Sequence, residues 1–150
     1  HGVLRHGRFV TVAACRLHPD GRLEVALAGH PRPLVLEPEG EGREASLPAN
    51  MPLGLLLTPA YECGSLQVRV DDTLLLFTDG ITESRRDGSL FGTEGICALW
   101  RDKPDADVRA LTRRLCDASA CYHDEGLAQD DRLALAARRR PARSRPRRPA

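Results

Sequence analysis

Residues 73–83, with the sequence TLLLFTDGITE, join an uninterrupted apolar run to an acidic turn. The run Thr73–Phe77 shows no alternation of polar and apolar residues, which is typical of a strand buried on both faces. Asp79 follows the run, and Gly80 would allow a sharp exit from the strand. A carboxylate held at a strand end suits a hard cation such as Mg²⁺ or Mn²⁺. An Asp-Gly pair is also common as a plain turn, so both interpretations stand at this point.

Outward from this run, the segments before residue 79 have the character of strands and turns. The HPDG sequence at residues 18–21 is a strong turn signal between two apolar segments, which predicts a hairpin. A second hairpin is expected around Asp71-Asp72, and a polar, Gly- and Pro-containing stretch predicts a surface loop. The expected strands are 8–17, 22–28, 33–36, 62–70 and 73–78, and the expected loop is 37–50.

After residue 79 the apolar spacing changes to that of helices. Residues 93–101 and 106–122 carry apolar residues three and four positions apart, which predicts two helices. Residues 132–137 then fit a last strand. Hairpins, helices and a returning strand together predict an α+β layered domain.

Composition supports one globular domain followed by a tail. The chain has 150 residues, 41% of them hydrophobic, and no apolar run long enough for a membrane span. It opens with His1 and its only methionine is Met51, so we expect the natural N-terminal portion to be absent. Residues 138–150 hold seven arginines and no acid; removing these seven from the 22 basic residues leaves 15 against 21 acidic ones, or −6 for residues 1–137.

The arginine-rich segment predicts a disordered, solvated tail at residues 138–150, outside a domain formed by residues 1–137. Binding of nucleic acid by this tail is the alternative, but no aromatic residue is interleaved with the charges, so nucleic acid is not the expected partner. The five cysteines are odd in number and form no CxxC pair. We therefore expect a reducing, cytoplasmic setting. Zinc held by Cys116, Cys121 and His123 is disfavoured, because a spacing of five turns the two thiols to different helix faces.

Two further segments are candidates for chemistry. Asp130 and Asp131 precede the last expected strand, and since adjacent residues of an extended chain point apart, at most one should share a site with Asp79. His30, in the Gly29-His30-Pro31 turn, is either an acid, base or ligand, or a structural residue hydrogen-bonded to the backbone. The chain contains no Gly-x-Ser-x-Gly elbow, P-loop or dinucleotide fingerprint.

Six ordered segments together resemble the SpoIIE-like branch of the metal-dependent protein phosphatase (PPM, phosphatase 2C-like) superfamily. The resemblance covers residues 8–137, and the TDGITE segment with a downstream Asp-Asp pair is its most specific part. The segments are RFVTVA (8–13), AGHPRP (28–33), PLGL (52–55), LLLFTDGITE (74–83), LFG (90–92) and DDRLALA (130–136).

The resemblance implies an α-β-β-α sandwich with antiparallel sheets, of which this chain would be the C-terminal part. It also implies a two-metal site for Mn²⁺ or Mg²⁺, whose activated water hydrolyses a phosphoserine or phosphothreonine, so no side chain acts as nucleophile. Asp79 and Asp130 would be metal ligands, and Gly80, Asp131, Gly29 and His30 would support them. The family's Asp-Val-x-Gly-x-Gly segment has no match in residues 1–7, so part of the metal site is expected to be missing.

The family implies a phosphoprotein partner, typically an anti-sigma-factor antagonist, and an upstream sensor domain. A degenerate module that binds phosphoproteins without catalysis is the second hypothesis. An interaction domain that holds an acidic partner through the arginine tail is the third.

Overall fold

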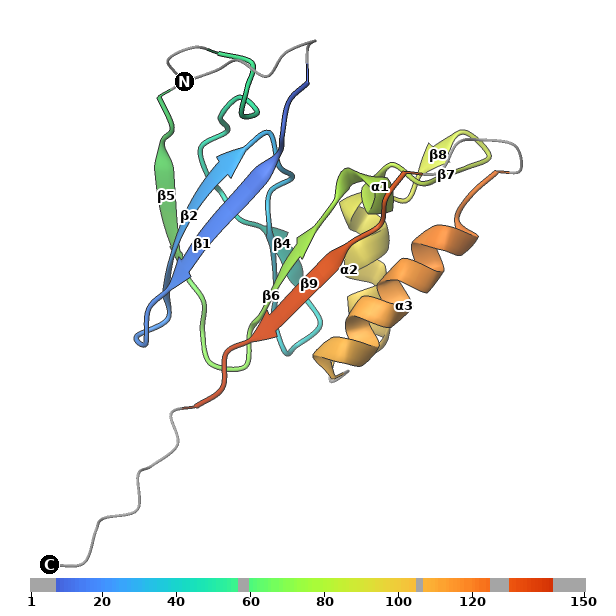
Figure 1. Ribbon diagram of the computed structural model, residues 1–150. Helices are drawn as coiled ribbons and strands as arrows, with labels where there is room; N and C mark the ends of the chain where they lie inside the picture. Colours follow the sequence, from blue (N-terminus) through green and yellow to red (C-terminus); the bar gives the residue numbers. More distant parts are fainter. Residues whose placement is uncertain (1–7, 57–59, 105–106, 125–129, 142–150) are drawn as a thin grey trace, which may run out of the picture.

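A computed structural model describes residues 8–56, 60–104, 107–124 and 130–141 (Figure 1). The described residues form two antiparallel sheets, a small hairpin and three helices. In chain order the elements are β1 (Val12–Leu17), β2 (Arg22–Ala28), β3 (Leu34–Leu36), β4 (Gly42–Glu44), β5 (Cys63–Gln67), β6 (Thr73–Phe77), α1 (Asp79–Thr82), β7 (Arg85–Arg86), β8 (Ser89–Leu90), α2 (Gly92–Asp102), α3 (Val108–Cys121) and β9 (Ala134–Arg138).

The first sheet has the strand order β1-β2-β5. Its β1–β2 hairpin is the predicted one, with Leu17 opposite Leu23 at the turn. The turn is closed by hydrogen bonds from His18 N to Arg22 O and from Gly21 N to His18 O, both 2.9 Å. Gly21 has φ +93°, a conformation that a side chain disfavours, which explains the glycine at this position.

The second sheet has the strand order β4-β3-β6-β9, and β6 lies inside it. Leu75 and Phe77 of β6 pack with the helices, and Leu74 packs against the first sheet. The prediction that Thr73–Phe77 is buried on both faces is therefore confirmed. Trp100 of α2 is fully buried in the helix-side core, and its Nε1 donates a hydrogen bond of 2.8 Å to Glu37 O.

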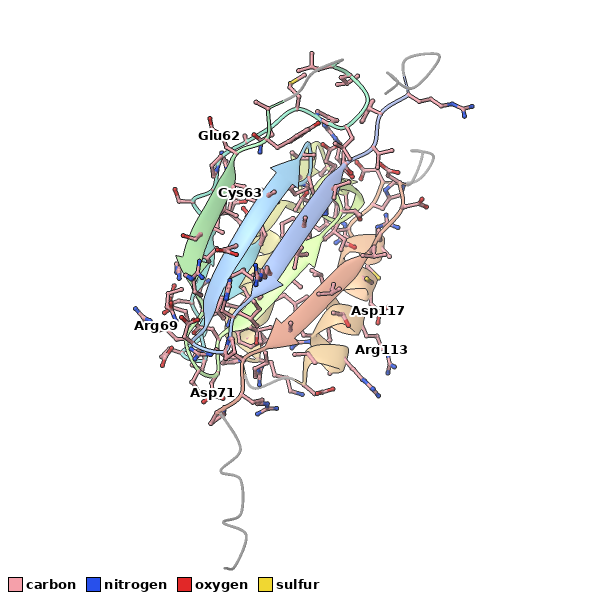
Figure 2. The ribbon with its side chains drawn as sticks, turned by 60° about the vertical axis from the view of Figure 1, so that its left-hand side comes forward. Glu62, Cys63, Arg69, Asp71, Arg113 and Asp117 are labelled. Atoms are coloured by element: carbon pink, nitrogen blue, oxygen red, sulfur yellow. The ribbon has the colours of Figure 1, made fainter. Side chains whose placement is uncertain are left out.

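The elements form layers, as the predicted α+β fold requires. Helices α2 and α3 cover one face of the second sheet, and the first sheet packs on its other face (Figure 1). Figure 2 views the first sheet, with Glu62 and Cys63 near one end of β5 and Arg69 and Asp71 near the other. No helix of the described residues covers the outer face of this sheet. The described part is thus one helical layer and both sheets of an α-β-β-α sandwich.

The prediction of a hairpin between residues 62–70 and residues 73–78 is wrong. Strand β5 pairs with β2, whereas β6 pairs with β3 and β9, so the chain changes sheets between them. A tight two-residue hairpin of type I′ needs positive φ at both central residues. Asp71 has φ +70°, but the φ of Asp72 is not positive. Asp72 is instead buried, with only 2% of its surface exposed.

Three smaller expectations also differ from the structure. Strand β4 lies within the expected loop 37–50, because residues 42–44 pair with β3 and extend the second sheet. Strand β1 begins at Val12, not residue 8. Arg138 ends β9, and Arg139 donates from Nη1 to Val68 O at 2.8 Å, so the folded part continues beyond residue 137. Residues 142–150 of the expected tail lie outside the described residues.

One margin of the two-sheet core stays uncovered within the described part of the chain. The register places Leu17 of β1 beside Leu23, and Leu135 of β9 beside Leu76, on the faces that point between the sheets. Leu17 is nevertheless 50% exposed and Leu135 53% exposed. Both strands are edge strands, β1 of the first sheet and β9 of the second.

Candidate metal centre

Asp79 lies where β6 ends and the single-turn helix α1 begins. Thr78 is the N-cap residue in extended conformation, and Asp79 occupies the first turn of the helix. Its Oδ1 accepts a hydrogen bond of 3.0 Å from Gly80 N. The residue is exposed, so the carboxylate stands in solvent at the end of a buried strand.

Asp130 lies on the segment that leads into β9. Its Oδ1 accepts a hydrogen bond of 2.8 Å from Asp131 N, and the residue is exposed. Strands β6 and β9 are antiparallel with Phe77 opposite Ala134, so the residues after β6 lie beside the residues before β9. The sheet therefore brings Asp79 and Asp130 to the same edge.

Thr78 joins the two segments through three hydrogen bonds. Its Oγ1 donates to Asp131 O at 2.8 Å and accepts from Leu133 N at 3.0 Å. Its backbone N donates to Leu133 O at 3.0 Å. Because Thr78 precedes Asp79 directly, these bonds fix the backbone of Asp79 relative to that of Asp131.

Gly80 lets the two segments approach closely. A Cβ built on Gly80 would lie 2.5 Å from Asp131 O and 3.1 Å from Asp130 C, closer than real side-chain contacts. The φ angle of Gly80 lies outside the left-handed region, so a sharp exit from the strand does not explain the glycine. Gly80 is explained instead by the close approach of the two segments, which leaves no room for a Cβ.

A second connection runs through Ser84 on the other side of α1. Ser84 Oγ donates to Gly80 O at 3.0 Å, and Arg132 Nε donates to Ser84 Oγ at 3.4 Å. Ser84 is 5% exposed, so these hydrogen bonds of its hydroxyl group are buried inside the turn. Sequence reasoning missed Thr78 and Ser84, because each hydroxyl group has a hydrogen-bond partner more than forty positions away in the sequence.

His30 and Gly29 have structural surroundings. His30 Nδ1 donates to Pro31 O at 2.9 Å, which matches the hydrogen-bonded alternative for this residue. Gly29 has φ +64° and lies against Pro52, whose Cγ would be 2.4 Å from an added Cβ. Gly29 N donates to Asn50 O at 2.8 Å, which ties the turn to the segment before PLGL.

The donors at the centre are of the kind that Mg²⁺ and Mn²⁺ prefer, namely carboxylate oxygens on well-fixed backbone. The donors are few. Among the residues that the structure describes, no group of three or more His, Cys, Asp or Glu side chains is placed to hold a metal ion. Asp131 contributes its backbone carbonyl to Thr78. A cation bound by Asp79 and Asp130 would keep several water ligands, as Mg²⁺ commonly does.

The cysteines offer no comparable centre. All five are free. Burial raises the pKa of the Cys97 and Cys116 thiols, which disfavours the thiolate that a metal would need.

The sequence matches the family model of stage II sporulation protein E, SpoIIE, over residues 1–140. The chain belongs to the SpoIIE family of PP2C-type serine phosphatases. This assignment confirms the family expected from the six ordered segments. Among the described helices of this SpoIIE-family chain, none combines the length and hydropathy of a membrane span.

Solved structures share the fold at low sequence identity. The phosphatase domain of the cell fate determinant SpoIIE from Bacillus subtilis, presoaked with Mn, aligns with TM-score 0.70 at 13% identity and covers 90% of this chain. The RsbU and RsbW domains of a Mycobacterium tuberculosis protein align with TM-score 0.65 at 21% identity and cover 88% of this chain. The SiaA-PP2C domain of Pseudomonas aeruginosa aligns with TM-score 0.64 at 21% identity over 79% of this chain.

The SpoIIE-family chain spans only part of each of these structures, namely 59%, 37% and 47% of their lengths, respectively. The match to part of larger domains fits the partial sandwich described above. No curated protein matches the sequence.

Proposed function

We propose that this chain is the part of a metal-dependent serine/threonine protein phosphatase that supplies Asp79 and Asp130 to a Mn²⁺ or Mg²⁺ site. The observation that carries the proposal is the set of three hydrogen bonds through Thr78. They hold the backbone next to both acids, which stand 51 positions apart in the sequence. Such positioning by rigid elements is what a metal or catalytic site requires.

In this proposal the residues of the chain bind and orient the metal ions, and no side chain attacks the phosphate. Asp79 and Asp130 supply negative charge and oxygen donors, and Thr78, Gly80 and Ser84 keep their segments in place. When bound, divalent cations supply a more acidic water and neutralise charge on the phosphoryl group. Gly29 and His30 shape the neighbouring turn, and Asp131 supports the site through its backbone.

Two carboxylates leave most positions of an octahedral cation to water or to donors outside the described residues. We therefore expect the 150-residue chain to bind Mn²⁺ weakly and to hydrolyse phosphate esters slowly or not at all. The proposed substrate of the whole phosphatase is a phosphoserine or phosphothreonine on a regulatory protein. An anti-sigma-factor antagonist as partner is part of this proposal, supported by the family and by the RsbU-containing relative. An upstream sensor domain and a cytoplasmic location belong to it as well, the location because the five cysteines form no CxxC pair.

The test measures Mn²⁺ binding by calorimetry and hydrolysis of p-nitrophenyl phosphate on the purified chain. Asp79→Asn and Asp130→Asn should each weaken Mn²⁺ binding by about tenfold or more, since each removes a charged donor. Asp117→Asn is the matched control, because Asp117 is an exposed acid on α3 (Figure 2) and should leave Mn²⁺ binding unchanged. Robust turnover that Asp79→Asn abolishes would show that the chain alone carries a complete site.

A non-catalytic module that binds phosphoproteins is the second candidate function. The observation that favours it is the small number of acidic donors among the described residues. Phosphopeptide binding that is insensitive to Mn²⁺ and to Asp79→Asn would favour this module over the phosphatase.

A further inference from the structure

An apolar surface lies on two segments that meet at one end of the sandwich. Its members are six exposed residues, which we call the apolar end patch: Phe9, Val10, Met51, Leu53, Leu55 and Leu56. Their exposed fractions range from 38% to 55%. Single exposed apolar residues are normal in proteins, whereas a gathering of several marks an interaction surface.

Backbone hydrogen bonds join the two segments that carry the patch. Val10 N donates to Leu53 O at 3.0 Å, and Leu53 N donates to Val10 O at 2.9 Å. Asn50 closes the base of the loop, because its Nδ2 donates to Leu27 O at 2.8 Å and its Oδ1 accepts from Glu62 N at 3.0 Å. The two segments that carry the patch are therefore tied together at Val10 and Leu53 and anchored at Asn50.

The segment between β4 and β5, which carries most of the patch, and the start of α1, which carries Asp79, both lie in the upper half of the view in Figure 1. Leu34, the first residue of β3, pairs with Leu75 of β6, so the turn at residues 29–33 lies next to the end of β6, where Asp79 follows. Gly29 of this turn bonds Asn50 at the base of the patch loop. A cavity of about 220 Å³, lined by His30, Arg32 and Asn50 among others, lies at this junction.

We propose that the apolar end patch is the docking surface for the protein substrate. Apolar side chains that flank the phosphorylated residue would lie on the patch while the phosphate reaches the centre at Asp79 and Asp130. The inference rests on the proposed function and adds the chemistry of the substrate segment. Two exposed arginines, Arg8 and Arg32, and one exposed acid, Glu62, lie beside the patch. The net positive charge of these surroundings suits a segment that is both apolar and negatively charged.

A protein substrate is the expected occupant of the patch, because the metal centre alone cannot distinguish one phosphoprotein from another. A phosphate group is the same on every phosphoprotein, so recognition of one protein must come from surfaces around the centre. An apolar surface with a fixed backbone serves this purpose, because its side chains need little reordering on binding.

The test compares two fluorescent phosphoserine peptides of equal length and charge, one with leucines and one with serines around the phosphoserine. In fluorescence polarisation with Mn²⁺ present, the chain should bind the leucine peptide about tenfold more tightly. The double variant Leu55→Glu/Leu56→Glu should remove this difference. Leu17→Glu is the matched control, because Leu17 is 50% exposed at the far end of β1, and it should preserve the difference.

Equal binding of the two peptides to the wild-type chain would overturn the proposal, as would an unchanged preference in the double variant. Chemical-shift mapping on the wild-type chain gives an independent measurement, since the leucine peptide should shift the amide signals of residues 50–56. Sedimentation that shows a dimer of the free chain, dissociated by Leu55→Glu/Leu56→Glu, would assign the patch to a second copy and also overturn it. Failure of the phosphatase function is recognised separately, by Mn²⁺ binding that does not respond to Asp79→Asn.

Discussion

The hydroxyl of Thr78 donates a 2.8 Å hydrogen bond to the backbone carbonyl of Asp131, a residue 53 positions further along the chain. The same oxygen accepts from Leu133 N, so one side chain both donates to and accepts from the segment before β9. A residue that carries no charge thus ties together the two segments that carry the acids of the candidate metal centre.

Replacement of Thr78 by valine keeps the shape of the side chain and removes both of its hydrogen bonds. We expect a loss of about 1–3 kcal/mol in the free energy of unfolding, because Asp131 O and Leu133 N each lose a partner. Mn²⁺ affinity should fall several-fold, as measured by calorimetry. Thr78→Ser retains the hydroxyl and should recover most of the affinity; a valine variant with wild-type affinity would show that the bonds do not position the acids.

Substitution of Gly80 by alanine should destabilise the chain although alanine is the better helix former. The new Cβ would meet the backbone of Asp131 at 2.5 Å, so the segments must separate, at a cost of about 1–3 kcal/mol in urea denaturation. Mn²⁺ binding should weaken with it. Gly88→Ala is the control: an added Cβ there meets nothing within 4 Å, so only its φ of +75° carries a cost, and Mn²⁺ binding should not change.

The change of sheets between β5 and β6 should depend on Arg138, the last residue of β9, and on Arg139, which follows it. Arg139 N donates to Asp72 O at 3.0 Å, Asp71 N donates to Arg139 O at 2.8 Å, and Arg138 stacks on the Trp100 ring at 5.6 Å. A chain that ends at residue 137 should therefore melt about 5–10 °C below one that ends at residue 141, as measured by circular dichroism. Equal melting temperatures would place the boundary of the domain at residue 137 after all.

The uncovered margin between β1 and β9 should promote self-association. Leu135 is 53% exposed on an edge strand, and such apolar edges pair readily with other chains. Leu135→Lys should lower the fraction of oligomer in analytical ultracentrifugation and reduce binding of an apolar fluorescent dye. Leu90→Lys changes a residue of similar exposure on the β7–β8 hairpin and should have little effect on either measurement.

Local patterns predicted the elements whose structure depends on near neighbours. The HPDG turn set the β1–β2 hairpin, and the unbroken apolar run identified β6 as a strand buried on both faces. The helices followed from their spacing, although α1 was not expected, because four residues are too few for a periodic pattern.

Features that depend on distant residues were not predicted. Asp71-Asp72 has the local character of a hairpin turn, and only the pairing of β5 with β2 and of β6 with β3 and β9 shows that the chain crosses between sheets here. Asp72 holds this crossing through hydrogen bonds with the backbone of Arg69 and Arg139. The six ordered segments predicted Asp79 and Asp130, whose juxtaposition the structure supports. Their metal ligation stays a prediction, and the hydroxyl groups that fix them were invisible in the sequence because threonine and serine are common beside any turn.

The pairing of β6 with β9 has a consequence for biosynthesis. The open edge of β6 ends at Phe77, and its partner residues end at Arg138, so translation must add 61 more residues before that edge can be covered. At bacterial and eukaryotic elongation speeds this is a delay of roughly 3–12 s. Asp130 arrives within this last stretch, so the nascent protein acquires its second acid only when the sheet itself is nearly complete. A site that uses both acids can therefore form only after translation has passed Asp130.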